Sequence, residues 1–152
     1  MRVSAPGVPE PPRAGMFSNA RVHGGHFFVS GMHAGGPDGP VGGDDAYEQA
    51  REAFRRVKDL VEACGAHADD ILVLRVYLTD IADKAAVGRA RSEMFTGDFP
   101  CSTLVEVSAL VDERLRVEIE AQGIVGSASG RDVVRLPQAA RPDPEPQESS
   151  AS

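Results

Sequence analysis

The residues most able to do chemistry lie on one strand near the end of the domain. Apolar and polar side chains alternate strictly from Leu115 to Gln122, in the run LRVEIEAQ. Successive side chains of a strand point to opposite faces, so one face here is apolar and the other carries Arg116, Glu118 and Glu120. A partly buried carboxyl can serve as a general base, because burial raises its pKa toward neutrality. This polar face is therefore the candidate functional surface.

A second charge interrupts another apolar strand, the one predicted for ILVLRVYLT at residues 71–79. Arg75 lies in the middle of this run, and a buried unpaired guanidinium would be costly, so it needs a partner. Glu118 or Glu120 is the expected partner if the two strands share a sheet. Strict alternation would place Leu72, Leu74, Val76 and Leu78 on one face of the strand, and Ile71, Val73, Arg75 and Tyr77 on the other.

Two helices and further strands must position these charges. The patterns predict strands at 16–22, 26–32 and 71–79, helices at 45–65 and 83–95, and two strands within 99–125. The order β-β-α-β-α-β-β predicts an α+β domain with both helices on one face of a mixed sheet of five or six strands. The other face would stay uncovered, so we expect it to be buried by self-association.

The composition indicates one domain with two tails. The chain has 152 residues, of which 41% are hydrophobic, enough for one core. We expect a flexible Pro-rich lead over residues 1–14, the domain over 15–125, and a mostly disordered tail over 126–152. Only 132–136 has the pattern of an extra strand there. Truncation after Gly126 should therefore leave the fold intact.

Charge and cysteine usage exclude several classes of protein. A net charge of −7 repels phosphate backbones, so we expect no nucleic-acid partner. No apolar run reaches the roughly 18 residues of a membrane span, and prolines interrupt the N-terminal segment where a signal peptide needs an apolar core. These features predict a cytoplasmic protein without a membrane partner. Cys64 and Cys101 lack metal-type spacing, so we expect no disulfide framework, no metal site and no cofactor.

From about Gly15 to Val125 the sequence resembles the RidA/YjgF family. The resemblance runs through FFVSGM, LVEACGAHADDIL, RVYLTDIAD, FPCSTLVEV and RVEIEAQGIV, in the family's order and spacing. It implies a chorismate-mutase-like subunit, a homotrimer whose sheets line a central barrel, and small-molecule clefts at the subunit interfaces. It also implies hydrolysis of reactive enamines and imines, such as 2-aminoacrylate, to keto acids and ammonia.

The resemblance marks cleft residues that are kept and others that are changed. Ser30 and Gly31 are kept, and Glu120 stands at the position linked to water activation. Ser102 replaces the arginine that holds the substrate carboxylate, a role suited to a bidentate guanidinium. An aromatic hydroxyl has become Phe17, and an asparagine has become Gly88.

These three changes predict weak or absent hydrolysis of 2-aminoacrylate, and an improvement on Ser102→Arg. Arg75, Arg89 and Arg91 are the cations that can take the place of the missing arginine. Their placement needs a structure.

Several residues have both a structural and a functional interpretation. Glu120 is either a general base or the ion-pair partner of Arg75 or Arg116. Cys101 is either a nucleophile, with His33 as its base, or a thiol that lines the cleft.

Ser102 and Thr103 either offer hydroxyls to a polar ligand or are ordinary strand residues.

Two functions remain open at this point. One is hydrolysis, or a related conversion, of an imine or enamine intermediate of specialised metabolism. The other is a non-catalytic trimer that binds a metabolite or a protein through the same clefts.

Overall fold

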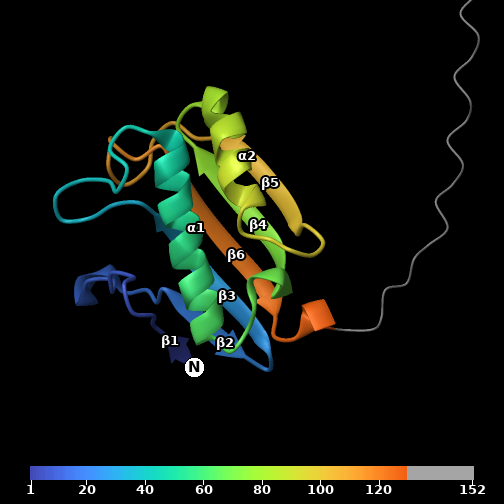
Figure 1. Ribbon diagram of the computed structural model, residues 1–152. Helices are drawn as coiled ribbons and strands as arrows, with labels where there is room; N and C mark the ends of the chain where they lie inside the picture. The colour runs from blue at the N-terminus through green and yellow to red at the C-terminus, as the bar shows by residue number, and fades with distance from the viewer. Residues whose placement is uncertain (130–152) are drawn as a thin grey trace, which may run out of the picture.

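The computed structural model describes residues 1–129, which form two helices packed on a six-stranded sheet (Figure 1). The helices are α1 (Ala46–Ala63) and α2 (Lys84–Ser92). Three short 3₁₀ turns lie between the longer elements, and a fourth, Ser127–Ser129, follows the last strand. The strands are β1 (Arg2–Val3), β2 (Ala20–His23), β3 (His26–His33), β4 (Ile71–Leu78), β5 (Cys101–Glu106) and β6 (Val117–Ile124). The segment at 132–136, where an extra strand was predicted, lies outside the described residues.

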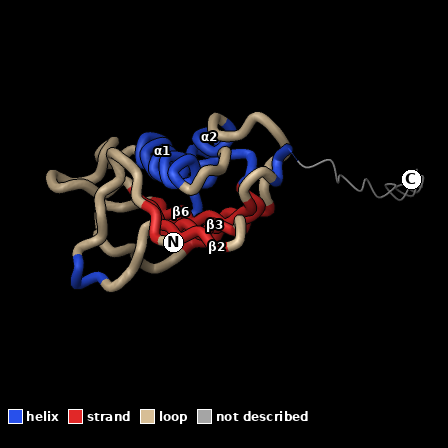
Figure 2. The backbone as a smooth tube through the Cα atoms, turned by 90° about the horizontal axis from the view of Figure 1, so that it is seen from below, coloured by secondary structure: helices blue, strands red, loops and turns tan. Residues whose placement is uncertain are grey.

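The sheet is mixed, with strand order β1-β2-β3-β6-β4-β5. Among the strands of residues 1–129, only β4 and β5 run parallel, and α2 joins them, because parallel neighbours need a crossover connection. Both helices lie on one face, as the view along the sheet shows (Figure 2). This arrangement confirms the predicted α+β class and leaves the second face without a helix in the described part of the chain. We call that second face the open face; it carries Phe28, Glu120, Arg75 and Thr103.

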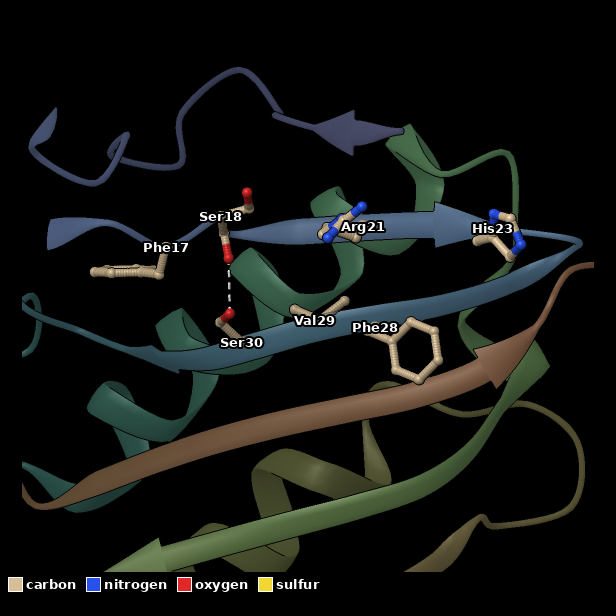
Figure 3. A pocket seen from close by; sticks show the side chains of 7 residues that line it. All are labelled: Phe17, Ser18, Arg21, His23, Phe28, Val29 and Ser30. Carbon is tan, nitrogen blue, oxygen red and sulfur yellow. Dashed lines mark hydrogen bonds between the residues drawn. The ribbon is translucent and has the colours of Figure 1, made fainter.

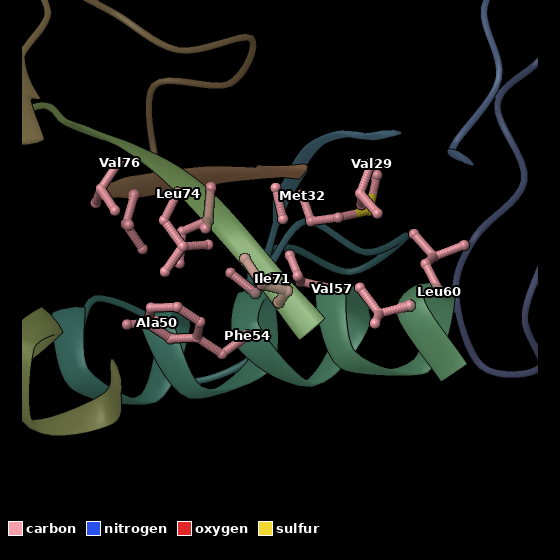
Figure 4. Close-up of a cluster of buried hydrophobic side chains, with 14 of the residues drawn as sticks. Val29, Met32, Ala50, Phe54, Val57, Leu60, Ile71, Leu74 and Val76 are labelled. Atoms are coloured by element: carbon pink, nitrogen blue, oxygen red, sulfur yellow. The ribbon is translucent and has the colours of Figure 1, made fainter. Parts of the chain in front are cut away.

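The core lies between the helices and the sheet (Figure 4). In the sequence, Asp45 and Glu48 have the spacing of a capping box, which predicts a helix start at residue 45. Helix α1 begins there, since the Asp45 carboxylate accepts hydrogen bonds from the backbone amides of Tyr47 and Glu48 at 2.9 and 3.1 Å. Its apolar stripe packs on alternate residues of β3, β4 and β6, which point toward the helices. The largest fully buried side chains include Phe27, Leu60, Leu74, Leu78 and Ile119. No helix among residues 1–129 is long and apolar enough to cross a membrane.

A β-bulge at the start of β4 changes the predicted alternation. Ile71 pairs with Gly123 and Val73 pairs with Gln122, so Leu72 is an extra residue without a partner on β6. Ile71 is therefore buried at 2% exposure and Leu72 is exposed at 43%, the reverse of the prediction for these two residues. From Leu74 onward the alternation holds, which places Arg75 on the open face as expected.

The first residues of the chain pack against the domain, where the sequence predicted a flexible lead. Strand β1 pairs with β2, and Val3, Ala5 and Val8 are all less than a tenth exposed. Asn19 donates a hydrogen bond through Nδ2 to the Pro9 carbonyl at 2.9 Å. The sequence does not predict this packing, because the prolines break the periodicity of the segment. They still allow it to form an edge strand and apolar contacts.

The end of the domain also differs from the predicted boundary at residue 125. Ser127 Oγ donates to the Asp70 carbonyl at 3.1 Å, and the Ala128 amide donates to Asp70 Oδ1 at 2.8 Å. Asp70 is 4% exposed, so these contacts satisfy a buried carboxylate. Burial by itself would raise the pKa of Asp70, but the amides of Ala128, His67 and Gly126 hold it below its usual value.

We therefore expect a chain truncated after Gly126 to be less stable than one truncated after Ser129. Losing the charge-assisted bond from Ala128 costs about 1–2 kcal/mol, which lowers the melting temperature by about 2–8 °C. Thermal unfolding of both truncated chains by circular dichroism measures the difference. Because the pKa of Asp70 is lowered, this stabilisation is present at neutral pH and is lost as the pH falls below about 4. Equal melting temperatures at pH 7 would contradict the assignment.

Candidate functional site

An ion pair lies at the centre of the open face. Arg75 on β4 is in register with Glu120 on β6 and with Thr103 on β5, so the three side chains stand side by side. Arg75 Nη1 donates to Glu120 Oε1 at 2.9 Å, with side-chain exposures of 40% and 30%. Of the two partners predicted for Arg75, Glu118 and Glu120, the structure pairs it with Glu120, and solvent still reaches both groups.

Arg116 does not contact Glu120. It lies just before β6, and its guanidinium donates to Asp83 Oδ2 at 2.9 Å and to Asp44 Oδ1 at 3.0 Å. Hydrogen bonds to Asp83 and then Asp44 raise the pKa of Arg116 further above its usual value. Of the two structural partners considered for Glu120, only Arg75 is in place.

A second carboxylate of the open face rests on Gly31. A Cβ atom added at Gly31 would collide with Glu118 Oε1, so glycine is required for this carboxylate to lie flat on β3. Glu118 is also in register with His33, whose Nδ1 accepts a hydrogen bond from the Gly35 amide at 3.0 Å. Burial lowers the pKa of His33, although the nearby Glu118 charge opposes the shift. The imidazole is therefore neutral at pH 7.

A shallow pocket of about 460 Å³ opens on the same face beside β2 and β3 (Figure 3). Phe17 and Phe28 are its aromatic walls, 53% and 47% exposed. Ser30 Oγ donates to the Ser18 carbonyl at 2.7 Å, which leaves its oxygen free to accept a hydrogen bond. The full lining is Phe17, Ser18, Arg21, His23, Phe28, Val29 and Ser30.

Ser102 lies on the other side of the sheet from Glu120. On β5, Cys101 and Thr103 face the open side, whereas Ser102 points toward α2 and accepts a hydrogen bond from Arg91 Nη1 at 2.8 Å. Gly88 precedes Arg91 by three residues on the same helix, so the two share a face of α2.

The residues predicted for one cleft therefore form two separate groups within the chain. Phe17, Ser30, Gly31 and His33 lie around β3, while Gly88 and Ser102 lie at the β5 edge. Three strand spacings separate β3 from β5, or roughly 14 Å. A single chain does not bring these groups together.

His33 does not lie beside Cys101. Cys101 is exposed and in register with Val73, while His33 lies on β3, beyond β4 and β6. The pairing of a Cys101 nucleophile with a His33 base is thus not formed within the chain. Among residues 1–129, no group of three or more His, Cys, Asp or Glu side chains is placed to hold a metal ion.

Comparison with known proteins identifies the family. The model of the endoribonuclease L-PSP family matches residues 8–125. The chain belongs to this family, the RidA/YjgF family that the sequence motifs indicate. A solved structure of a protein of unknown function from Pseudomonas aeruginosa is 42% identical, covers 82% of this chain and 92% of its own, and superposes with a TM-score of 0.73.

Two further RidA/YjgF relatives are informative. The YjgF gene product of Escherichia coli is 28% identical over 82% of this chain and 98% of its own, with a TM-score of 0.72. A 2-iminobutanoate/2-iminopropanoate deaminase of Salmonella typhimurium is 36% identical over 81 residues, which are 51% of this chain and 62% of the deaminase. The match to the deaminase thus spans less than two thirds of either protein.

Within this RidA/YjgF fold, two contacts of the site were not foreseen from the sequence. Glu118 was predicted only as a partner of Arg75; the signal that could have revealed its contact with β3 is Gly31, a glycine inside an apolar strand. The contact between Arg91 and Ser102 had no signal of its own, because it depends on how α2 lies across β5.

Proposed function

We propose that this chain is a RidA-like hydrolase, which converts an imine or enamine intermediate of specialised metabolism to a carbonyl compound and ammonia. The observation that carries the proposal is the Glu120 carboxylate, held by Arg75 at 2.9 Å and partly open to solvent on a sheet face that no helix in residues 1–129 covers. The deaminase relative supports the same chemistry.

The reaction needs one water molecule and no oxidant or reductant. An enamine first gains a proton at carbon and loses one from nitrogen to solvent, which makes it an imine. Glu120 then takes a proton from water while the water oxygen bonds to the imine carbon, and the imine nitrogen is protonated. Glu120 then passes its proton to the nitrogen, the C–N bond breaks and ammonia leaves, while the hydroxyl gives its proton to solvent as the C–O bond becomes a carbonyl. Arg75 orients the carboxylate for this proton transfer.

The complete site, in this proposal, forms between copies of the chain in a homotrimer. The open face has no helix to cover it and exposes apolar side chains such as Phe28 and Val105, 47% and 41% exposed. The group around β3 and the group at the β5 edge are too far apart to act together in one copy. Packing the β5 edge of one copy near β3 of the next would join them.

Location and other partners are part of the same proposal. We place the protein in the cytoplasm, where Cys64 and Cys101, both free in the structure, stay reduced. A net charge of −7 gives no support to a nucleic-acid substrate, so we propose a small molecule as the ligand.

A non-catalytic trimer that binds a metabolite or a protein is the second candidate. It is favoured by one feature of the same site, since Arg75 already engages the Glu120 carboxylate. The changes to Phe17, Gly88 and Ser102 point in the same direction.

Ammonia release separates the two candidates. Imines are generated in place by an amino-acid oxidase acting on a panel of amino acids, and ammonia is measured with and without the protein. A hydrolase accelerates release above the spontaneous rate for at least one imine, whereas Glu120→Gln does not. Absence of acceleration across the panel, with ligand binding intact, would support the binding protein instead.

A further inference from the structure

A groove of about 370 Å³ lies at the end of the sheet where β4 and β5 begin. Two neighbouring aspartates hold its walls in place. Asp69 Oδ1 accepts hydrogen bonds from the backbone amides of Thr96 and Gly97 at 3.0 and 3.2 Å. Asp70 Oδ1 accepts a hydrogen bond from the Ala128 amide at 2.8 Å. One wall is thus the segment that leads into β5, and the other is the turn that follows β6.

The groove exposes apolar side chains that the described fold leaves uncovered. The β-bulge at the start of β4 turns Leu72 out of the core, where it is 43% exposed. Phe99, in the segment before β5, is 63% exposed. Cys101 lines the same groove with a free and exposed thiol. Exposed apolar side chains that gather in a concave site indicate a surface that another segment or molecule covers.

The described part of the chain ends beside this groove. Its last turn, Ser127–Ser129, directly follows β6 and supplies two of the lining residues (Figure 1). The next apolar residues in the sequence begin with Val133 and Val134, in the run RDVVRL at 131–136, which lies outside the described residues. An extended chain covers about 3.3–3.6 Å per residue, so Val133 can reach any point within roughly 14 Å of Ser129. This tether is long enough to bring the run into the groove.

The groove and the run at 131–136 also have complementary charge. Asp69 and Asp98 line the groove, and Asp98 has no ion pair within residues 1–129. The run carries Arg131 and Arg135 around its apolar pair. A short tether gives an effective concentration in the mM range, so a contact that is weak between separate molecules is populated within one molecule.

We infer that the groove at the start of β4 and β5 is a docking site for residues 131–136 of the same chain. The apolar side chains of this segment cover Leu72 and Phe99, and its arginines face Asp98. A docked segment also shields the thiol of Cys101 from solvent. The inference goes beyond the proposed hydrolysis and does not depend on it, because it uses none of the residues assigned to that reaction.

The reactivity of Cys101 reports whether the groove is covered. The full chain is treated with N-ethylmaleimide, and mass spectrometry of its peptides follows modification of Cys101 and of Cys64, which is partly buried at the end of α1 and serves as the internal reference. Val134→Asp and Leu136→Asp each place a charge within the docking segment. Ala139→Asp is the matched control, since it adds the same charge three residues beyond the segment. Circular dichroism checks that all variants keep the fold.

We expect Cys101 to react about tenfold more slowly in wild type and in Ala139→Asp than in Val134→Asp or Leu136→Asp, with equal rates for Cys64. This factor corresponds to an effective concentration of about 1 mM and a dissociation constant of about 0.1 mM for the separate segment. Leu72→Ser tests the groove side of the contact. It should also speed modification of Cys101, and adding Val134→Asp to it should give little further increase, because the two residues act through one contact.

Three outcomes would overturn the docking site. Equal reactivity of Cys101 in wild type, Val134→Asp and Leu136→Asp would mean that the segment does not cover the groove. Protection that survives both substitutions and decreases on dilution would assign the groove to a contact between copies of the chain. Loss of protection in Ala139→Asp as well would show an effect of net charge on the reaction, with no specific contact of residues 131–136.

Discussion

Replacing the central carboxylate by its amide, Glu120→Gln, is expected to lower kcat/KM for imine hydrolysis about 10²- to 10⁴-fold, the usual contribution of a positioned general base. Glutamine keeps the size of the side chain, and its amide oxygen can still accept a hydrogen bond from Arg75. It cannot take a proton from water. The measurement is ammonia release from the best substrate of the imine panel, at substrate concentrations below KM.

The fold should tolerate this change. The Arg75–Glu120 pair is 40% and 30% exposed, and ion pairs that are this open to solvent contribute only about 0–1 kcal/mol. The melting temperature of Glu120→Gln should therefore stay within a few degrees of wild type. A loss of activity in Glu120→Gln would then reflect a slower chemical step and not an unfolded protein.

Glu118→Gln provides a matched comparison, because it removes the same charge from the same face of β6 two residues away. If proton transfer by Glu120 is the cause, the loss for Glu118→Gln should be much smaller, below about tenfold. Similar losses of activity for both variants would mean that activity depends on the total negative charge of this face. Neither glutamate would then act as a specific general base. Unchanged activity of Glu120→Gln would reduce Glu120 to an ion-pair partner of Arg75.

The alternation of strands was the part of the fold most accessible from the sequence. It placed Arg75 with Glu118 and Glu120 on one face, and the cost of an unpaired guanidinium predicted one of these two glutamates as the partner of Arg75. The capping pattern likewise located the start of α1 at Asp45. These inferences succeeded because each depends on short-range periodicity and on a local energetic requirement.

The sequence could not reveal features that depend on contacts between distant segments. Leu72 is an extra residue only relative to β6, so the bulge is invisible in the run of β4 alone. The buried Val3 and Val8 lie in a Pro-rich segment whose lack of periodicity gives no sign that it packs against the domain. The Arg91–Ser102 contact depends on the position of α2 over β5. Each of these requires the tertiary arrangement, which a period of two or 3.6 residues does not encode.

Separation of the site into two groups of residues has a direct experimental consequence. If each cleft takes Glu120 from one copy and Arg91, which contacts Ser102 at the β5 edge, from the next, then Glu120→Gln and Arg91→Ala damage different sides of the same cleft. A trimer that contains both kinds of chain then has some clefts with both residues intact. A single-chain site has no such possibility, because no chain in the mixture carries both residues.

Mixing the two variants is therefore expected to restore activity that neither has alone. After unfolding and joint refolding in equal amounts, random assembly leaves about one quarter of the clefts intact. Ammonia release from a carboxylate-bearing imine below KM should thus reach about a quarter of the wild-type rate, against roughly a tenth or less for each variant refolded separately. Light scattering of each sample checks that trimers have formed. Activity of the mixture no higher than the average of the two variants, with trimers present, would place the whole site within one chain.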